Sequence, residues 1–285
     1  MNIFSQIKEI SFSSELYPES LKSLADAPKT LYAVGEINLL KTRKFTVVGS
    51  RTTPTAALKI GATIAKELSE TFTLVTGTAD GGDGAVIEGA LKGSGKVICI
   101  LAGGFFSIPQ GNLPLLERVA KSGLLLSSHE NDAPVRSFSY EYRNKLLAVL
   151  GEGTLVLGAA KKSGALITAK YAKAYDKPIF AFPYAPGAYA GEGCNDLIKK
   201  GAYLTENSMD VLGRFGINFI EKKVAPALSD EEERLLQALR ALSEAHISEL
   251  SAHTAIPVFK ARALLSALEV RGVIVALGGN RYSPV

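Results

Sequence analysis

Residues 44–51 read KFTVVGSR, a short run of apolar and β-branched residues that stops at glycine, serine and arginine. Such a run is typical of a buried strand that ends in a loop. Thr53-Pro54 follows, with Thr53 expected at the N-cap and Pro54 at the first helical position, and a helical pattern continues to about Glu70. The stretch therefore predicts one strand–loop–helix unit.

The same unit repeats along the chain. Further apolar strands are expected at residues 72–75, 96–101, 124–127, 154–157 and 178–182, and helical patterns separate most of them. Apolar strands that alternate with helices predict a mostly parallel sheet with helices on both faces. The fold class is therefore α/β and Rossmann-like.

The sequence divides into four parts. Residues 1–43 are a short N-terminal segment, polar and rich in turn signals, for which we expect a short helix and turns. Residues 44–215 hold the repeated units and form the Rossmann-like domain, and residues 216–228 are the expected linker. Residues 229–285 form a small second domain.

The second domain has the pattern of a winged helix-turn-helix. Ser229 and Glu232 predict a capping box at the start of a first helix, and a second helix covers residues 247–253. A third helix runs from Pro257 to Val270, and Gly278-Gly279 separates two short strands that form the wing. Helix, helix, helix and wing together predict this module.

Composition indicates a globular protein of the cytoplasm. The 285 residues are 47% hydrophobic and 21% charged, without a run near the roughly 18 apolar residues of a membrane span. The N-terminus lacks the pattern of a signal peptide, so we expect no membrane association and a cytoplasmic location. Cys99 and Cys194 lie in unrelated motifs, which favours two buried, reduced thiols.

The net charge of +4 is unevenly distributed. Residues 229–285 contain six basic and seven acidic side chains, a net charge of −1, so residues 1–228 carry the remaining +5. The larger part is therefore the better candidate for contact with phosphate groups.

Two expected loops at strand ends combine glycine with hydroxyl and basic groups. Gly49, Ser50 and Arg51 follow the first strand of the Rossmann-like domain. In a parallel sheet, ligands bind beyond the carboxyl ends of the strands, where backbone N–H groups and helix dipoles favour anions. Arginine adds a guanidinium that donates two parallel hydrogen bonds to phosphate.

The second such loop follows the strand at residues 154–157. It contains Lys161, Lys162, Ser163 and Gly164, and Thr168 lies about one helical turn further on. The glycines of both loops are also compatible with tight turns alone, but two basic loops at neighbouring strand ends favour phosphate binding.

Residues 140–145 alternate aromatic and basic side chains. Tyr140, Arg143, Asn144 and Lys145 offer a ring for stacking on bases and cations for the backbone, the combination used to bind single-stranded nucleic acid. A helix start whose aromatic rings anchor the core remains the alternative.

Other catalytic and cofactor patterns are absent from the sequence. There is no dinucleotide fingerprint after the first strand, no Walker A motif and no Cys/His metal spacing. We therefore expect no cofactor, no metal and no enzymatic activity. One alternative remains, a nucleotide or sugar-phosphate hydrolase in which Glu88, after the glycine-rich loop at residues 80–84, acts as a base.

The sequence resembles the DNA-processing protein A (DprA/Smf) family over nearly the whole chain, and the matching motifs follow one another in the same order. The matching blocks are VVGSR at residues 47–51, RNK at 143–145, SGALITA at 163–169 and the block from Gly193 to Ala202, together with Tyr17-Pro18, Leu31-Tyr32 and the winged module.

The resemblance implies a homodimer that binds and protects incoming single-stranded DNA and loads the recombinase RecA onto it during natural transformation, without an established catalytic activity. The DNA pocket it implies is lined by Gly49, Ser50, Arg51, Arg143, Asn144, Lys145, Ser163, Gly164 and Thr168. The acidic winged helix is expected to contact protein, or duplex DNA weakly.

The chain departs from the family pattern beside this pocket. The family's Ala-Arg-Gly-Ile-Asp loop reads ADGGD at residues 79–83, so Asp80 stands where the family has a base, and Ile87 stands at a histidine position. We therefore expect DNA binding in this chain to depend more on Lys161 and Lys162 than it does in the family. A run from Gly81 to Glu88 resembles nucleoside-monophosphate phosphoribohydrolases, which is the basis of the hydrolase alternative.

Overall fold

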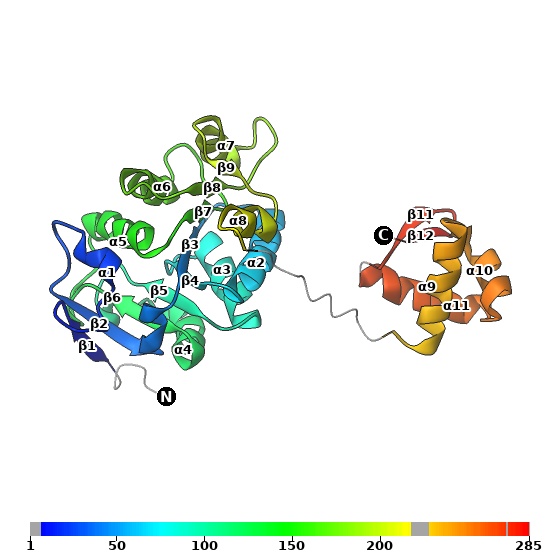
Figure 1. Cartoon of the computed structure of the whole chain (residues 1–285), viewed down its shortest axis with the longest axis horizontal. Helices are drawn as coiled ribbons and strands as arrows, with labels where there is room; N and C mark the ends of the chain where they lie inside the picture. Colours follow the sequence, from blue (N-terminus) through cyan, green and yellow to red (C-terminus); the bar gives the residue numbers. More distant parts are fainter. Residues whose placement is uncertain (1–6, 218–227, 272, 285) are drawn as a thin grey trace. The chain divides into compact units, whose positions relative to one another are not determined.

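The computed structural model describes residues 7–217, 228–271 and 273–284. The chain forms two compact units, residues 1–219 and residues 220–285 (Figure 1). Each unit has a hydrophobic core of its own, so each is described separately. No helix among the described residues has the length and apolar character needed to cross a bilayer.

The first unit is built on one sheet with the strand order β1-β2-β6-β5-β4-β3-β7-β8-β9. From β6 to β9 every neighbouring pair is parallel, and β1 and β2 pair antiparallel at one edge. The predicted mostly parallel α/β sheet is therefore confirmed. The strands are β1 (Lys8–Ser11), β2 (Thr30–Gly35), β3 (Lys44–Val48), β4 (Thr73–Thr76), β5 (Val97–Ile100), β6 (Leu124–Ser127), β7 (Thr154–Val156), β8 (Ile179–Ala181) and β9 (Tyr203–Leu204).

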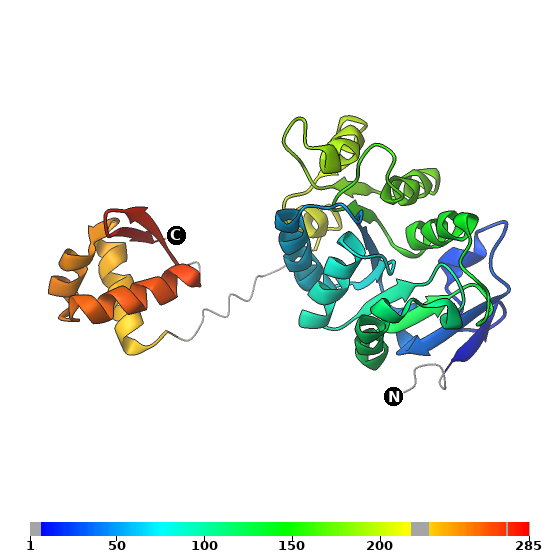
Figure 2. The same cartoon turned by 180° about the vertical axis from the view of Figure 1, so that it is seen from behind.

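Helices cover both faces of this sheet, as Figures 1 and 2 show. The α-helices are α1 (Glu19–Lys22), α2 (Thr55–Ser69), α3 (Gly82–Lys92), α4 (Leu113–Ser122), α5 (Ser137–Leu150), α6 (Ala165–Ala174), α7 (Glu192–Lys199) and α8 (Ser208–Arg214). Short 3-10 helices are η2 (Ile37–Lys41), η3 (Phe105–Ser107), η4 (Gln110–Asn112) and η5 (Tyr189–Gly191).

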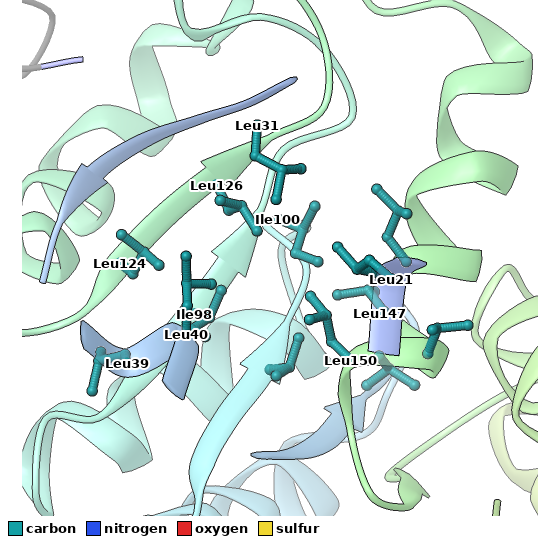
Figure 3. Packing of buried hydrophobic residues seen from close by; sticks show 14 of the residues in the cluster. Leu21, Leu31, Leu39, Leu40, Ile98, Ile100, Leu124, Leu126, Leu147 and Leu150 are labelled. Carbon is teal, nitrogen blue, oxygen red and sulfur yellow. The ribbon is translucent and has the colours of Figure 1, made fainter. Parts of the chain in front are cut away.

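The core of the first unit has two layers because successive strand residues point to opposite faces. In β5, Cys99 packs in the layer of α2, α3 and α4, whereas Ile98 and Ile100 pack in the layer of α1 and α5. Figure 3 shows the second layer, where Leu147 of α5 and Leu21 of α1 approach the sheet. Both layers bury strand residues, which explains the near-continuous apolar runs.

The expectation of only a short helix and turns in residues 1–43 was wrong. The segment contributes β1 and β2 to the sheet, with α1 between them. In β2, Leu31 and Ala33 are fully buried, so the strand is fixed by packing on the sheet rather than by its polar surroundings. The two-residue strand β9 was also not predicted.

The second unit is the predicted winged helix. Its helices are α9 (Asp230–Leu242), α10 (Ile247–Thr254) and α11 (Val258–Val270), and its strands β10 (Ala245–His246), β11 (Ile274–Gly278) and β12 (Arg281–Pro284) form a small sheet. The capping box is present: the Ser229 N–H donates to the Glu232 carboxylate at 2.8 Å, and the Glu232 N–H donates to the Ser229 hydroxyl at 3.3 Å.

Three smaller expectations can be compared with the structure. Pro54 and Pro257 stand at the N-cap rather than at the first helical position, one residue from the prediction. Cys99 and Cys194 are both buried and unpaired, as expected. The predicted linker, residues 216–228, lies mostly outside the described residues.

Candidate functional site

A cavity of about 420 Å³, here the first cavity, lies where the carboxyl ends of β3 and β7 meet the starts of α5 and α6. It joins the two loops that the sequence singled out, so Arg51 and Ser163 border the same hollow. Ten of the twelve predicted site residues line it: Gly49, Ser50, Arg51, Tyr140, Arg143, Asn144, Lys162, Ser163, Gly164 and Thr168.

Two glycines allow the loops after β3 and β4 to touch backbone to backbone. A Cβ on Gly82 would lie 2.2 Å from the Gly49 Cα, closer than any side chain permits. The Gly82 N–H also donates to the Ser50 carbonyl at 3.1 Å. The glycines are therefore required by close packing, and this packing fixes the position of Arg51 at the next residue.

The cations at the mouth of the first cavity are Arg51 and Lys162. Both are exposed, and neither takes part in any ion pair found among the described residues. The hydroxyl beside Arg51 is held locally, because the Thr52 N–H donates to the Ser50 Oγ at 3.0 Å. Two unpaired cations on neighbouring strand tips are suited to an anionic ligand.

Beneath these cations lies a buried polar layer. The Asp83 carboxylate accepts hydrogen bonds from the Gly49 and Ala79 N–H groups, each at 3.3 Å. The Arg143 guanidinium donates from Nη1 to the Ile100 carbonyl at 3.0 Å and is only 6% exposed. Burial raises the pKa of Asp83 and lowers that of Arg143, while the opposite charge of each partner counters the shift.

Arg143 and Asn144 line the cavity as predicted, and both also belong to this buried layer. The Arg143 Nε donates to Asn144 Oδ1 at 3.0 Å, and the Asn144 amide donates to the Gly164 carbonyl at 3.1 Å. A Cβ on Gly77 would lie 2.3 Å from both Arg143 and Asp83, which shows how tightly the layer is packed. These side chains support the loops from below and form part of the floor of the cavity.

Two predicted residues do not line the first cavity at all. The Lys145 ammonium lies 2.5 Å from the Asp26 carboxylate and its side chain is only 16% exposed. Lys161 borders a different hollow, which it shares with Lys170 and Lys200 between α6 and α7. Of the two lysines on which DNA binding is expected to depend, only Lys162 lines the first cavity.

Thr168 borders the first cavity from a buried position. The residue is 1% exposed, and its Oγ1 is buried without a hydrogen-bond partner among the described residues. Its contact with a phosphate stays a prediction.

Two exposed aromatic rings flank the first cavity. Tyr140, at the start of α5, was predicted and is 42% exposed, with the Arg143 Cζ 5.9 Å from its ring centre. Tyr189, in the loop after β8, is 70% exposed and was missed. Its place in the loop after a neighbouring parallel strand was the available signal, because such loops converge at one edge of the sheet.

A second cavity, of about 270 Å³, adjoins the first. Arg51, Ala79, Tyr140 and Arg143 line both cavities and form the wall between them. Asp80, the residue that departs from the family pattern, lines the second cavity only and is exposed.

The role of Glu88 as a catalytic base is contradicted by its contacts. Its carboxylate is paired with Arg118, whose Nη2 donates to Oε2 at 3.0 Å, and it lines neither cavity. The hydrogen bonds from Arg118 lower the pKa of Glu88, the wrong direction for a base that must take up a proton near neutral pH. Among the described residues, no group of three or more His, Cys, Asp or Glu side chains is arranged to hold a metal ion.

Comparison with known proteins gives the family. Residues 8–216 match the family described as DNA recombination-mediator protein A, and residues 221–280 match the DprA winged helix domain. The chain belongs to the DNA recombination-mediator protein A family.

Relatives in this recombination-mediator family are similar over most of their length. The DNA processing protein DprA of Bacillus subtilis is 36% identical over 211 residues, which cover 72% of this chain and 70% of that protein. The DNA processing protein DprA of Streptococcus pneumoniae is 32% identical over 213 residues, covering 74% and 76%.

Solved structures of the family share the fold of the first unit. The structure of DNA processing protein A from S. pneumoniae matches with a TM-score of 0.70 and 31% identity over 74% of this chain and 75% of that chain. The Helicobacter pylori structure, which describes a unique single-stranded DNA binding mode of that protein, matches with a TM-score of 0.67 and 29% identity over 74% and 95%.

Proposed function

We propose that this chain binds single-stranded DNA at the first cavity without cutting it and passes the strand to the recombinase RecA during natural transformation. The observation that carries the proposal is the pair of exposed, unpaired cations, Arg51 and Lys162, on two strand-tip loops that border one hollow. Membership of a recombination-mediator family and the strand-binding relative from H. pylori support it.

The chemistry of the first cavity fits a polynucleotide backbone. The Arg51 guanidinium donates to two oxygens of one phosphate, and Lys162 neutralises a neighbouring phosphate. Gly49 and Gly164 lie in the two loops that border the cavity, where backbone N–H groups favour an anion. The rigid buried layer below holds both loops before the strand arrives.

The exposed rings fit unpaired bases rather than a duplex. Tyr140 and Tyr189 flank the cavity, and aromatic faces stack on the bases of a single strand with little dependence on sequence. A duplex keeps its bases stacked on each other, so those rings have no partner in it. The two exposed rings therefore support the proposed preference for single strands over duplexes.

The proposal includes a non-enzymatic role in the cytoplasm. The acid that lines the first cavity, Asp83, is 5% exposed and accepts two backbone hydrogen bonds, so it is poorly placed to activate water. A homodimer is supported by the edge strand β9, where Tyr203 is 40% and Leu204 49% exposed, because an apolar edge strand is a surface for pairing with another chain.

The test compares two matched arginine variants in a binding assay with labelled single-stranded 20-mers. Arg51→Ala is expected to weaken binding about 30-fold, since charge-assisted hydrogen bonds contribute about 1.5–3 kcal/mol. Arg262→Ala removes an exposed arginine from the winged helix and is expected to change the affinity less than twofold. Equal affinities for Arg51→Ala and the parent protein would contradict the proposed site.

A further inference from the structure

The two adjoining cavities differ in the charges that they present. The exposed side chains of the first cavity that are charged at neutral pH are Arg51 and Lys162, both cationic. The second shares Arg51 at the common wall but adds the exposed carboxylate of Asp80. A carboxylate repels a phosphate group and accepts hydrogen bonds, so the second cavity does not suit the DNA backbone.

The remaining lining of the second cavity mixes apolar and polar groups, as a nucleobase does. Leu101, Ile108 and Leu116 contribute apolar surface, and the Tyr140 ring forms part of the wall towards the first cavity. At about 270 Å³ the space is slightly below the range of about 300–1,000 Å³ found for drug-sized ligands. It therefore suits a single base better than a whole nucleotide.

Two other polar side chains of this cavity, those of Asn112 and Ser107, are already hydrogen-bonded to backbone carbonyls. The Asn112 amide donates to the Thr78 carbonyl at 2.8 Å, and the Ser107 hydroxyl donates to the Ala133 carbonyl at 2.7 Å. The Asp80 carboxylate, in contrast, takes part in none of the ion pairs or side-chain hydrogen bonds found among the described residues. Asp80 is thus an available acceptor at the edge of the second cavity.

We propose that the second cavity is a nucleobase subsite in which Asp80 selects guanine. The N1–H and the N2 amino group of guanine lie side by side and donate in parallel to the two oxygens of one carboxylate. Adenine and cytosine offer one amino group on that edge, and thymine offers one imino group. This inference rests on the proposed single-strand binding, because the phosphate next to the selected base occupies the first cavity and Arg51 lies between the two.

The experiment measures the affinity of the full chain for three labelled 20-mers by fluorescence anisotropy. The first is oligothymidine, the second carries guanine at every third position, and the third carries hypoxanthine there, which keeps N1–H and lacks the amino group. We expect the guanine oligomer to bind about tenfold more tightly than oligothymidine, within the range for a bidentate base contact, and the hypoxanthine oligomer to fall between them.

Asp80→Asn tests the role of the carboxylate, because an amide keeps one acceptor and loses the paired acceptors and the charge. We expect the preference for guanine to fall below twofold, with oligothymidine bound at least as tightly as by the parent protein. Glu70→Gln is the matched control: it removes an exposed acid at the opposite end of the 15-residue helix α2, about 22 Å from that helix's start beside the first cavity, and should leave the preference unchanged.

Each outcome decides between the hypotheses. Equal binding of oligothymidine and the guanine oligomer by the parent protein overturns the guanine subsite and leaves the proposed function intact. A guanine preference that persists in Asp80→Asn overturns the role of Asp80. If the parent protein binds none of the three oligomers, the proposed function itself fails.

Discussion

The two units of this chain use their basic side chains differently. In the first unit, Arg51 and Lys162 stand unpaired at the rim of a cavity. In the winged helix, the Lys260 ammonium lies 2.6 Å from the Glu231 carboxylate, the Arg281 Nε lies 2.5 Å from Glu244, and Arg271 pairs with Glu232.

We expect the position of unpaired cations beside a cavity to matter more for DNA binding than the number of cations in a unit. The winged helix has six basic residues in 57, but three are paired with its own acids. On α11, the helix that such modules place in the major groove, Phe259 is 79% exposed and Lys260 is paired. We therefore expect this unit to contact a protein, or duplex DNA only weakly.

The largest effect on stability and binding is expected where the backbones of two loops of the first unit touch. Gly82→Ala places a Cβ 2.2 Å from the Gly49 Cα, so we expect a loss of about 2–3 kcal/mol in the free energy of unfolding, measured in urea, and a loss of strand binding. Gly84→Ala, in the same helix, is the control. Its added Cβ meets no atom closer than 3.9 Å, and the helix should become slightly more stable. Equal destabilisation by both variants would contradict the importance of the glycine contact.

The next effect concerns the exposed rings. Tyr189→Ala should weaken the binding of a single-stranded 20-mer about tenfold, since stacking contributes about 1–3 kcal/mol per base. Phe259→Ala removes a still more exposed ring, from the winged helix, and should change the affinity less than twofold. Anisotropy titrations check both, and an equal loss in the two variants would remove the distinction between the units.

Two adjacent lysines of the first unit allow a cation that lines the first cavity to be compared with one that does not. Lys162 lines the first cavity and Lys161 borders the other hollow. Lys162→Ala should weaken binding about fivefold and reduce the dependence of log affinity on log salt concentration by about one phosphate contact. Lys161→Ala should change either quantity little. A larger effect of Lys161→Ala would place the strand in the hollow between α6 and α7 instead.

The smallest effect on binding is expected from removing the winged helix. Because residues 1–219 form a compact unit with their own core, a chain without residues 220–285 should bind single strands within twofold of the full chain. Gel shifts over a range of protein concentrations measure this, and a complete loss of binding would mean that the second unit takes part in the site.

Much of the fold followed from local pattern. In the run at residues 44–48, the side chains that point to either face of the sheet are buried, and the structure places the run in the middle of a parallel sheet. Strand β2 was missed because its burial depends on β6, which is 90 residues away in the sequence, and no local pattern carries that information. Strand β9, with two residues, is too short for a periodic signal.

The sequence predicted correctly which loops meet at the site, because this depends only on the order of the strands. It did not predict which side chains of α5 face the site, because this depends on their direction around the helix. The loops at Gly49 and Gly164 meet because they follow the adjacent parallel strands β3 and β7. Arg143 and Lys145 are two positions apart on α5, so they point to different sides of the helix. The first lies under the cavity, and the second reaches Asp26, which follows α1.

The most direct test of the account is to find where a bound strand touches the chain. A thymidine 20-mer carrying 5-iododeoxyuridine is bound to the full chain and irradiated, and the crosslinked peptides are identified by mass spectrometry. The account predicts crosslinks to peptides that contain Tyr140 or Tyr189, and their loss when Arg51→Ala is used at the same protein concentration. Crosslinks confined to residues 229–284 would contradict it.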